Sequence, residues 1–190
     1  MHRNVLCLIA ITLLMLVSSA GHSAAEDAAP PAETPDAQSA PLQLHRGKDP
    51  DGWTYLAYVR PLSYSVGHGD LGRFRQGEKK LVLAGTPFET GLVAHAVSSV
   101  RYKLAGKCKE FQASYGLPHG TVARFVVRCD GEERFRSDRV WATGGTRRHG
   151  IVKPIQLDVT GVDVLELVTY GDDNGQTAGS FGTWADPRVR

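Results

Sequence analysis

The residues of this sequence that are best suited to chemistry are a few histidines and carboxylates. His68 and Asp70 lie in a glycine-rich stretch, VGHGDLG, and both residue types ligate metal ions. A metal site needs three or more converging ligands, so an ordinary polar loop is the favoured interpretation. His95 lies in an apolar stretch, GLVAHAVSSV, where an imidazole either hydrogen-bonds within the fold or lines a pocket.

No motif for catalysis is evident. The sequence lacks the G-x-S-x-G turn of a strained nucleophile, the H-E-x-x-H zinc motif and a phosphate-cradling glycine loop. Two acid pairs, Glu132-Glu133 and Asp172-Asp173, fall in expected turns, where acids are usually solvated. The sequence alone cannot place two carboxylates at the separation that glycoside hydrolysis needs. A hydrolase is therefore the least favoured function, and no catalytic residue is assigned.

Three tryptophans lie near strand ends or in loops: Trp53, Trp141 and Trp184. A ring at such a position either fills the core or presents an apolar face to a ligand, as when the C–H face of a sugar stacks on it. We expect Trp184 in the core and leave both interpretations open for Trp141.

The elements that must position these side chains are predicted to be strands. Apolar and polar residues alternate with a period of two, which is typical of half-buried strands. Gly85, Asp130-Gly131 and Thr160-Gly161 are predicted hairpin turns. No window has a helical pattern with caps, so many short strands predict an all-β sandwich or barrel. The expected strand segments are Trp53–Arg60, Lys80–Ala84, Thr86–Thr90, His95–Leu104, Phe111–Tyr115, Val122–Cys129, Ile155–Val159 and Val164–Leu167.

The chain divides into three parts by composition. Residues 1–20 carry Arg3, an apolar run and small residues at the end, which is the order of a secretory signal peptide; an uncleaved N-terminal anchor is the alternative. Residues 21–41 are rich in Ala, Pro and acids and predict a disordered spacer. Residues 42–190 suit a single domain. The layout indicates a secreted, periplasmic or cell-surface protein.

Charge and cysteine content agree with export. Removing Arg3 and the four spacer acids from 22 bases and 20 acids leaves 21 and 16, a net charge of +5 for the domain. The arginines are scattered and form no block that tracks phosphates, so nucleic-acid binding is not expected. Cys108 and Cys129 are the two domain cysteines, and in an oxidising compartment we expect a disulfide, which would close a loop of about 20 residues. Two thiolates without nearby partners support zinc only weakly.

A set of short motifs resembles a known family across residues 53–190. The motifs in order are GL-x-x-HA-x-S from Gly91 to Ser98, FQA-x-YG from Phe111 to Gly116, LDVTGV from Leu157 to Val162 and WAD from Trp184 to Asp186. Together they resemble the NPCBM family of carbohydrate-binding modules that accompany glycoside hydrolases. The resemblance implies a galactose-binding-like jelly roll that attaches an enzyme or a cell surface to glycans.

The chain departs from the family pattern at two places. Leu117, Pro118 and His119 stand where the family often has a pair of acids, and Phe181 to Thr183 stand where it tends to have His-Ala-Asp. The family's fold commonly holds a structural calcium ion, but these changes remove candidate ligands. We therefore expect no cofactor.

The favoured function is a secreted, non-catalytic module that binds a glycan or polysaccharide. The alternative is a structural or protein-interaction sandwich of the cell envelope, with an envelope protein as partner, that has lost sugar binding. We expect aromatic rings to stack on the sugar, and His95 and Arg73 to hydrogen-bond its hydroxyls. The candidate ligand-binding residues are His95, Arg73, Tyr115, Trp141 and Asp186.

Overall fold

A computed structural model describes residues 51–77, 79–118, 122–141, 151–171 and 180–190 of the chain. These residues belong to one compact unit within Ala32–Arg190. The expected signal peptide (1–20), the spacer (21–41) and the start of the expected domain (42–50) lie outside the described residues. His119 and the pair Asp172-Asp173 also lie outside them. In the part of the chain that is described, no helix has the length and hydropathy needed to cross a membrane.

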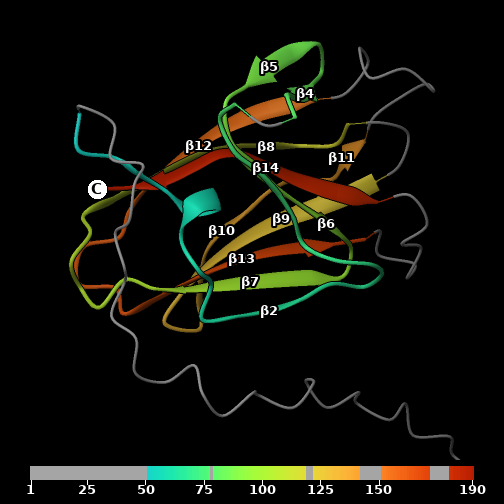
Figure 1. Cartoon of the computed structure of the whole chain (residues 1–190). Coiled ribbons are helices and arrows are strands. Elements are labelled where there is room, and N and C mark those ends of the chain that lie inside the picture. Colours follow the sequence, from blue (N-terminus) through green and yellow to red (C-terminus); the bar gives the residue numbers. More distant parts are fainter. Residues whose placement is uncertain (1–50, 78, 119–121, 142–150, 172–179) are drawn as a thin grey trace, which may run out of the picture. The chain divides into compact units, whose positions relative to one another are not determined.

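The described strands form two antiparallel six-stranded sheets and one small hairpin, stacked as layers (Figure 1). Sheet I has the order β12-β8-β14-β6-β3, and β1 also pairs with β14; its strands are β1 Thr54–Tyr55, β3 Gly72–Phe74, β6 Gly91–His95, β8 Glu110–Gly116, β12 Val152–Asp158 and β14 Phe181–Val189. Sheet II has the order β10-β9-β13-β7-β2, and β11 also pairs with β9; its strands are β2 Ser63–Ser65, β7 Ser98–Lys103, β9 Val122–Cys129, β10 Glu132–Arg136, β11 Val140–Trp141 and β13 Val164–Tyr170. The predicted all-β jelly-roll sandwich is confirmed.

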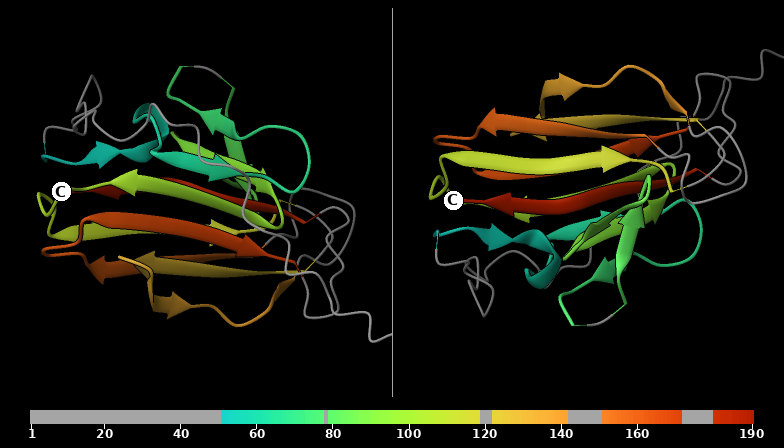
Figure 2. Two further views of the ribbon diagram at one scale, coloured as in Figure 1. Left: turned by 90° about the horizontal axis from the view of Figure 1, so that it is seen from below. Right: turned by 90° about the horizontal axis from the view of Figure 1, so that it is seen from above.

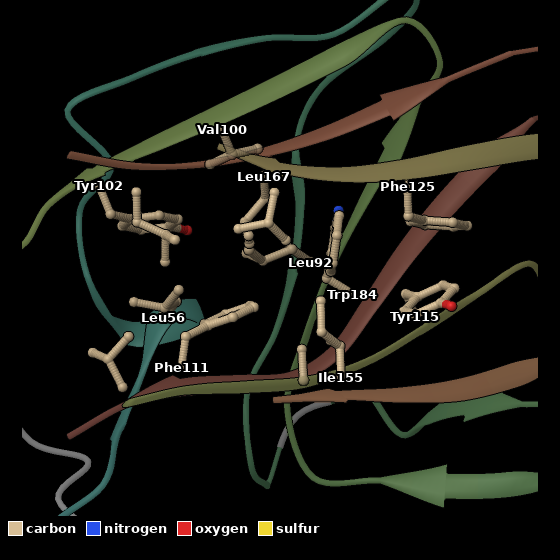
Figure 3. Close-up of a cluster of buried hydrophobic side chains, with 14 of the residues drawn as sticks. Leu56, Leu92, Val100, Tyr102, Phe111, Tyr115, Phe125, Ile155, Leu167 and Trp184 are labelled. Carbon is tan, nitrogen blue, oxygen red and sulfur yellow. The ribbon is translucent and has the colours of Figure 1, made fainter. Parts of the chain in front are cut away.

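Alternation along the strands builds the core between the sheets. In β7, Val100 and Tyr102 are buried while Arg101 and Lys103 are partly exposed. Neighbouring residues of a strand point to opposite faces, so one face of each sheet supplies the apolar side chains. Figure 3 shows side chains from both sheets meeting in this cluster, Phe111 and Trp184 from sheet I among them.

Two predicted hairpins are confirmed. Ala84 and Gly85 both have positive φ and join β4 (Leu81–Leu83) to β5 (Thr86–Phe88). Asp130 and Gly131, at φ 53° and 86°, make the two-residue turn between β9 and β10. A turn with positive φ at both positions matches the right-handed twist of the strands that it joins.

Three predicted segments differ from the structure. Thr160-Gly161 does not close a hairpin, because β12 before it and β13 after it belong to different sheets. The expected strand His95–Leu104 is interrupted at Ala96-Val97, where the chain passes from β6 in sheet I to β7 in sheet II. Trp53–Arg60 is a strand only at β1 and continues as a short 3-10 turn, η2 (Leu56–Tyr58). Alternation alone does not reveal where a strand changes sheet.

The β4–β5 hairpin packs on the outer face of sheet I, which is the face that points away from sheet II. Leu81 and Leu83 form a second apolar cluster with Ala185 of β14. Figure 1 shows the hairpin beyond β12, β8 and β14, and the two views of Figure 2 show the sheets roughly face-on, from below and above. The hairpin therefore covers part of a sheet face that would otherwise be open.

The predicted disulfide is not present, because Cys108 and Cys129 are both free and buried. Cys129 ends β9 in sheet II, whereas Cys108 lies ahead of β8 in sheet I. Each sulfur packs in the core as a small apolar group. Burial raises the pKa of both thiols, so each stays protonated near neutral pH.

Candidate functional site

One end of the sandwich, which we call the loop end, gathers the strand termini that flank the longer connections. β6 ends at His95 and β8 at Gly116, and β14 begins opposite them, because Phe181 pairs with His95 and Thr183 with Gly116. In sheet II, Trp141 of β11 pairs with Val122 at the start of β9. Ligand contacts in β-sandwiches are commonly made by loops at one end of a rigid scaffold, which makes this end the first candidate.

His95 lies in a small aromatic cluster at the loop end. Its ring meets Phe181 edge-on, with centroids 5.0 Å apart and planes at 88°. The ring of His68, from the predicted polar loop, also lies edge-on to His95, with centroids 6.0 Å apart and planes at 74°. Phe181 and His95 are directly opposite each other on neighbouring strands, so their side chains emerge from the same face of sheet I.

Hydrogen bonding fixes which nitrogen of His95 is available to a ligand. Nδ1 lies 2.7 Å from the carbonyl oxygen of Ala96, and a carbonyl oxygen only accepts, so Nδ1 carries the proton in this contact. In the neutral ring Nε2 is then the acceptor. An imidazole held in this way is able to accept a hydrogen bond from a ligand hydroxyl.

Close backbone approach positions the cluster. A Cβ on Gly67 would lie 2.7 Å from the carbonyl carbon of Ala96, so glycine lets the His68 loop sit against the turn after β6. The Gly67 N–H donates to the carbonyl of His95 at 3.1 Å. A Cβ on Gly182 would lie 2.6 Å from Oγ1 of Thr169 on β13, so glycine also lets β14 approach sheet II beside Phe181. Both glycines are placed by contacts that the sequence pattern does not disclose.

Trp141 is an exposed aromatic residue at the same end. Its side chain is 53% exposed on β11, and Val97, in the turn after β6, is 50% exposed. An exposed aromatic ring of this kind offers an apolar face on which a sugar can stack. For Trp141 the structure therefore favours the surface interpretation over the core one.

Tyr115 lies in the core and not at the loop-end surface. It is 5% exposed, and its ring packs against Phe125 at 5.0 Å, Phe135 at 5.4 Å and Trp184 at 6.1 Å (Figure 3). Trp184 is buried with it, as expected from the sequence. Tyr115 points from β8 into the core, so its ring is not available to a ligand at the surface.

Arg73 lies on edge strand β3, directly opposite Leu92 of β6. Since Leu92 points into the core, Arg73 leaves β3 on the core side, where its charge acts on the phenol of Tyr102. Within the described part of the chain no hydrogen bond or ring contact joins Arg73 to His95. The structure therefore does not bring together these two predicted hydroxyl-binding residues.

Asp186 has a structural task in β14. It lies at φ 45° in a bulge of the β14–β8 pairing, and its Oδ1 accepts hydrogen bonds from Thr90 N at 2.8 Å and Thr90 Oγ1 at 3.0 Å. Asp186 is also one of the residues that line a hollow on the outer face of sheet I. Asp186 lies five residues along β14 from Phe181, so it is part of the hollow and not of the His95 cluster.

Phe181 is the loop-end residue that sequence reasoning missed. In the sequence it stands out only as a departure from the family pattern, and its pairing with His95 depends on a long-range register between β14 and β6. No group of three or more metal-ligating side chains occurs among the described residues, and His68 with Asp70 is part of no such group.

Comparison with known families and structures gives a consistent result. The profile of the NPCBM/NEW2 domain matches residues 52–190. No curated protein matches the sequence. A CBM51-2 and INT domain structure from Clostridium perfringens ZmpB, in complex with GlcNAc, is similar at a TM-score of 0.60 and 23% identity, over 73% of this chain and 31% of that chain.

Two further solved structures share the fold. The CBM51 of Clostridium perfringens GH95, in complex with methyl-galactose, has a TM-score of 0.59 and 21% identity over 73% of this chain and 99% of that chain. The tandem CBM51 modules of Sp3GH98 from Streptococcus pneumoniae have a TM-score of 0.54 and 17% identity, over 75% of this chain and 48% of that chain. Residues 52–190 place this chain in the NPCBM/NEW2 domain family, with the fold of the CBM51 carbohydrate-binding modules.

Proposed function

We propose that this protein is an exported, non-catalytic module that binds glycans at the loop end of its sandwich. The observation that carries the proposal is the family match over residues 52–190, because the NPCBM/NEW2 domain is a carbohydrate-binding type. The exposed ring of Trp141 and the cluster of His95 with Phe181 support the location. Sugar recognition combines apolar surface with a few placed polar groups, and this end offers both.

Each loop-end residue has a distinct role in this proposal. The ring of Trp141 stacks on the C–H face of a sugar. Nε2 of His95 accepts a hydrogen bond from a hydroxyl, since Nδ1 is held by Ala96. Phe181 supports the imidazole edge-on and holds its orientation. Arg73 and Tyr115, which lie on the core side of their strands, are not assigned to this site.

The first sugars to test come from the related structures. The ZmpB module was solved with GlcNAc and the GH95 module with methyl-galactose. We propose that binding needs no calcium, since Leu117 and Pro118 replace the acids that the family often has. Chelation of calcium is then expected to leave the affinity unchanged.

The N-terminal part of the chain supports an exported location. A cleaved segment 1–20 and an acidic, proline-rich spacer 21–41 would leave the module tethered or free outside the cytoplasm. The proposed partner is a polysaccharide or glycan on that side of the membrane, and no nucleic acid is expected.

Titration of the full chain with GlcNAc and methyl-galactose, followed by the indole NMR signals, tests the location of the site. We expect the Trp141 signal to shift, and His95→Ala to lower the affinity about tenfold. Tyr64→Ala, a half-exposed aromatic on edge strand β2, is the matched control and is expected to bind normally. A ligand that binds equally well to the Trp141→Ala and His95→Ala variants would contradict the proposed site.

A further inference from the structure

The outer face of sheet I holds a hollow beside the β4–β5 hairpin, which we call the trough. Its volume is about 420 Å³, within the range of small-molecule sites. Phe88 of β5 and Pro154 of β12 supply apolar walls, and Gln112, Gln156 and Arg188 supply polar groups. Arg188 lies seven residues along β14 from Phe181, so this part of the trough is about 20 Å from the loop end, whereas Ser114 lies two residues from Gly116 at the end of β8.

A row of polar side chains crosses four strands at the trough. Tyr55, Arg188, Gln112 and Gln156 are successive direct partners across β1, β14, β8 and β12. Direct partners share a face, so the row lies on the outer side of sheet I. The Arg188 guanidinium donates from Nη1 to Tyr55 Oη at 3.2 Å and from Nη2 to Gln112 Oε1 at 3.0 Å.

The row is held in place by neighbours. Gln112 Nε2 and Gln156 Nε2 both donate to Oε1 of Glu110, whose Oε2 accepts from Arg190 Nε at 2.8 Å. The hydrogen bonds from Arg190 and Gln112 hold the pKa of Glu110 below its usual value. Arg188 also lies over the ring of buried Trp53, 4.6 Å from its centroid. The polar groups are thus oriented before any ligand arrives, which reduces the entropy cost of binding.

Several hydrogen-bonding groups of the trough remain available. Arg188 uses two of the five N–H donors of a guanidinium in its contacts with Tyr55 and Gln112. Ser114, one step along β8 on the same face, has a hydroxyl with no hydrogen-bond partner among the described residues. Oε1 of Gln156 likewise accepts no hydrogen bond in the described part of the chain.

The charges of the trough nearly cancel. Glu110 is paired with Arg190, with Nη2 and Oε2 2.6 Å apart. Arg188 and Asp186 then contribute one positive and one negative charge to the lining, and they do not pair with each other. A ligand with a net charge would be attracted by one of the two and repelled by the other. A neutral ligand rich in hydroxyls is able to accept from Arg188 and donate to Asp186 or Gln156.

We propose that the trough is a second saccharide site, specific for a neutral sugar unit that lies with its apolar face against Phe88 and Pro154. The inference builds on the proposed glycan binding but uses different residues, so the module would contact two sugar units at once. Binding at two points raises the avidity for a polysaccharide without any change at the loop end.

Titration of the isotope-labelled full chain with chitotriose or galactotriose tests the proposal. We expect shifts of the Ser114 amide and of the Gln112 and Gln156 side-chain amides, and these shifts persist in Trp141→Ala. Ser114→Tyr fills the trough from an outward-facing position and is expected to weaken this binding at least tenfold, about the effect of losing a hydrogen-bonded contact. Trigalacturonate, the acidic comparator, is expected to bind the trough at least tenfold more weakly.

Arginine variants distinguish the contribution of the guanidinium hydrogen bonds to binding from that of the positive charge. Arg188→Lys keeps the charge, loses the fork and is expected to weaken trisaccharide binding several-fold, whereas Arg134→Lys on exposed β10 is the matched control and binds normally. Trough signals that do not move at millimolar trisaccharide, or that disappear in Trp141→Ala, would overturn the second site. Equal or tighter binding of trigalacturonate would overturn its neutral specificity. Trough shifts without loop-end shifts would refute only the loop-end site.

Discussion

At the level of single residues, the side of the strand decides what an aromatic ring does. Tyr115 and Trp184 point inward and pack around Phe125, whereas Phe181 and Trp141 leave the core. Tyr102 is the extreme case, because its phenol is fully buried and Oη has no hydrogen-bond partner among the described residues. A buried, unpaired hydroxyl costs free energy, so this residue is open to a direct test.

Replacing Tyr102 with phenylalanine is expected to raise the free energy of unfolding by about 1 kcal/mol, because it removes the unpaired hydroxyl.

Burial raises the pKa of Tyr102 far above its usual value, so the folded state keeps the proton that the unfolded chain loses above about pH 10. The stability that depends on this proton is present below pH 10 and is lost as the pH rises toward the raised pKa. Urea unfolding at pH 8 and pH 11 should show a smaller alkaline loss in Tyr102→Phe than in the wild type. Tyr64→Phe, a half-exposed phenol, is the control. An unchanged alkaline loss in Tyr102→Phe would refute this account.

The buried thiols give a second prediction at this scale. Cys108 and Cys129 are free, and burial raises their pKa values, so both are expected to react slowly with a thiol reagent in the folded protein and rapidly in denaturant. In a Cys7→Ser variant these two are the only cysteines of the sequence, so the assay counts their thiols alone. Finding no free thiol in denaturant without reductant would show that the pair is oxidised instead.

At the level of elements, sequence periodicity identified most strands and their buried faces but not their partners. The alternation in β7 and β9 predicted which residues are buried, and the Asp130-Gly131 turn predicted its hairpin. The sheet change at Ala96-Val97 and the separate sheets of β12 and β13 were missed, because alternation carries no information on long-range pairing. Tyr115 shares the buried face of β8 with Phe111 and Ala113, and its packing against Phe125 and Trp184 depends on the long-range pairing of the strands.

Gly182 tests how closely β14 and β13 must approach. An alanine Cβ there would collide with the side chain of buried Thr169, including Oγ1 at 2.6 Å. Gly182→Ala is expected to lower the free energy of unfolding by about 1–3 kcal/mol, the usual range for overpacking. The double variant with Thr169→Ala is expected to recover part of this loss, because it removes Cγ2 and Oγ1. Chemical denaturation measures both, and a Gly182→Ala protein as stable as the wild type would contradict the close contact.

At the level of the whole molecule, the sandwich offers two candidate sites. The loop end carries Trp141 and His95, while the outer face of sheet I carries the Arg188 row beside the β4–β5 hairpin. Residue types and family resemblance predicted Trp141 and His95 as single candidate residues, but not that both lie at one end of the sandwich. The sequence did not predict the second site, because the row from Tyr55 to Gln156 forms only when four strands distant in sequence are in register.

The central claim, that this module binds glycans, is tested most directly by screening the full chain on an array of host, plant and microbial glycans, with Trp141→Ala and Ser114→Tyr screened in parallel. We predict that the wild type binds a defined subset of glycans, and that each variant loses part of this signal while its melting temperature stays close to that of the wild type. A blank array for a folded wild-type protein would contradict glycan binding and favour the alternative, a structural or protein-interaction domain.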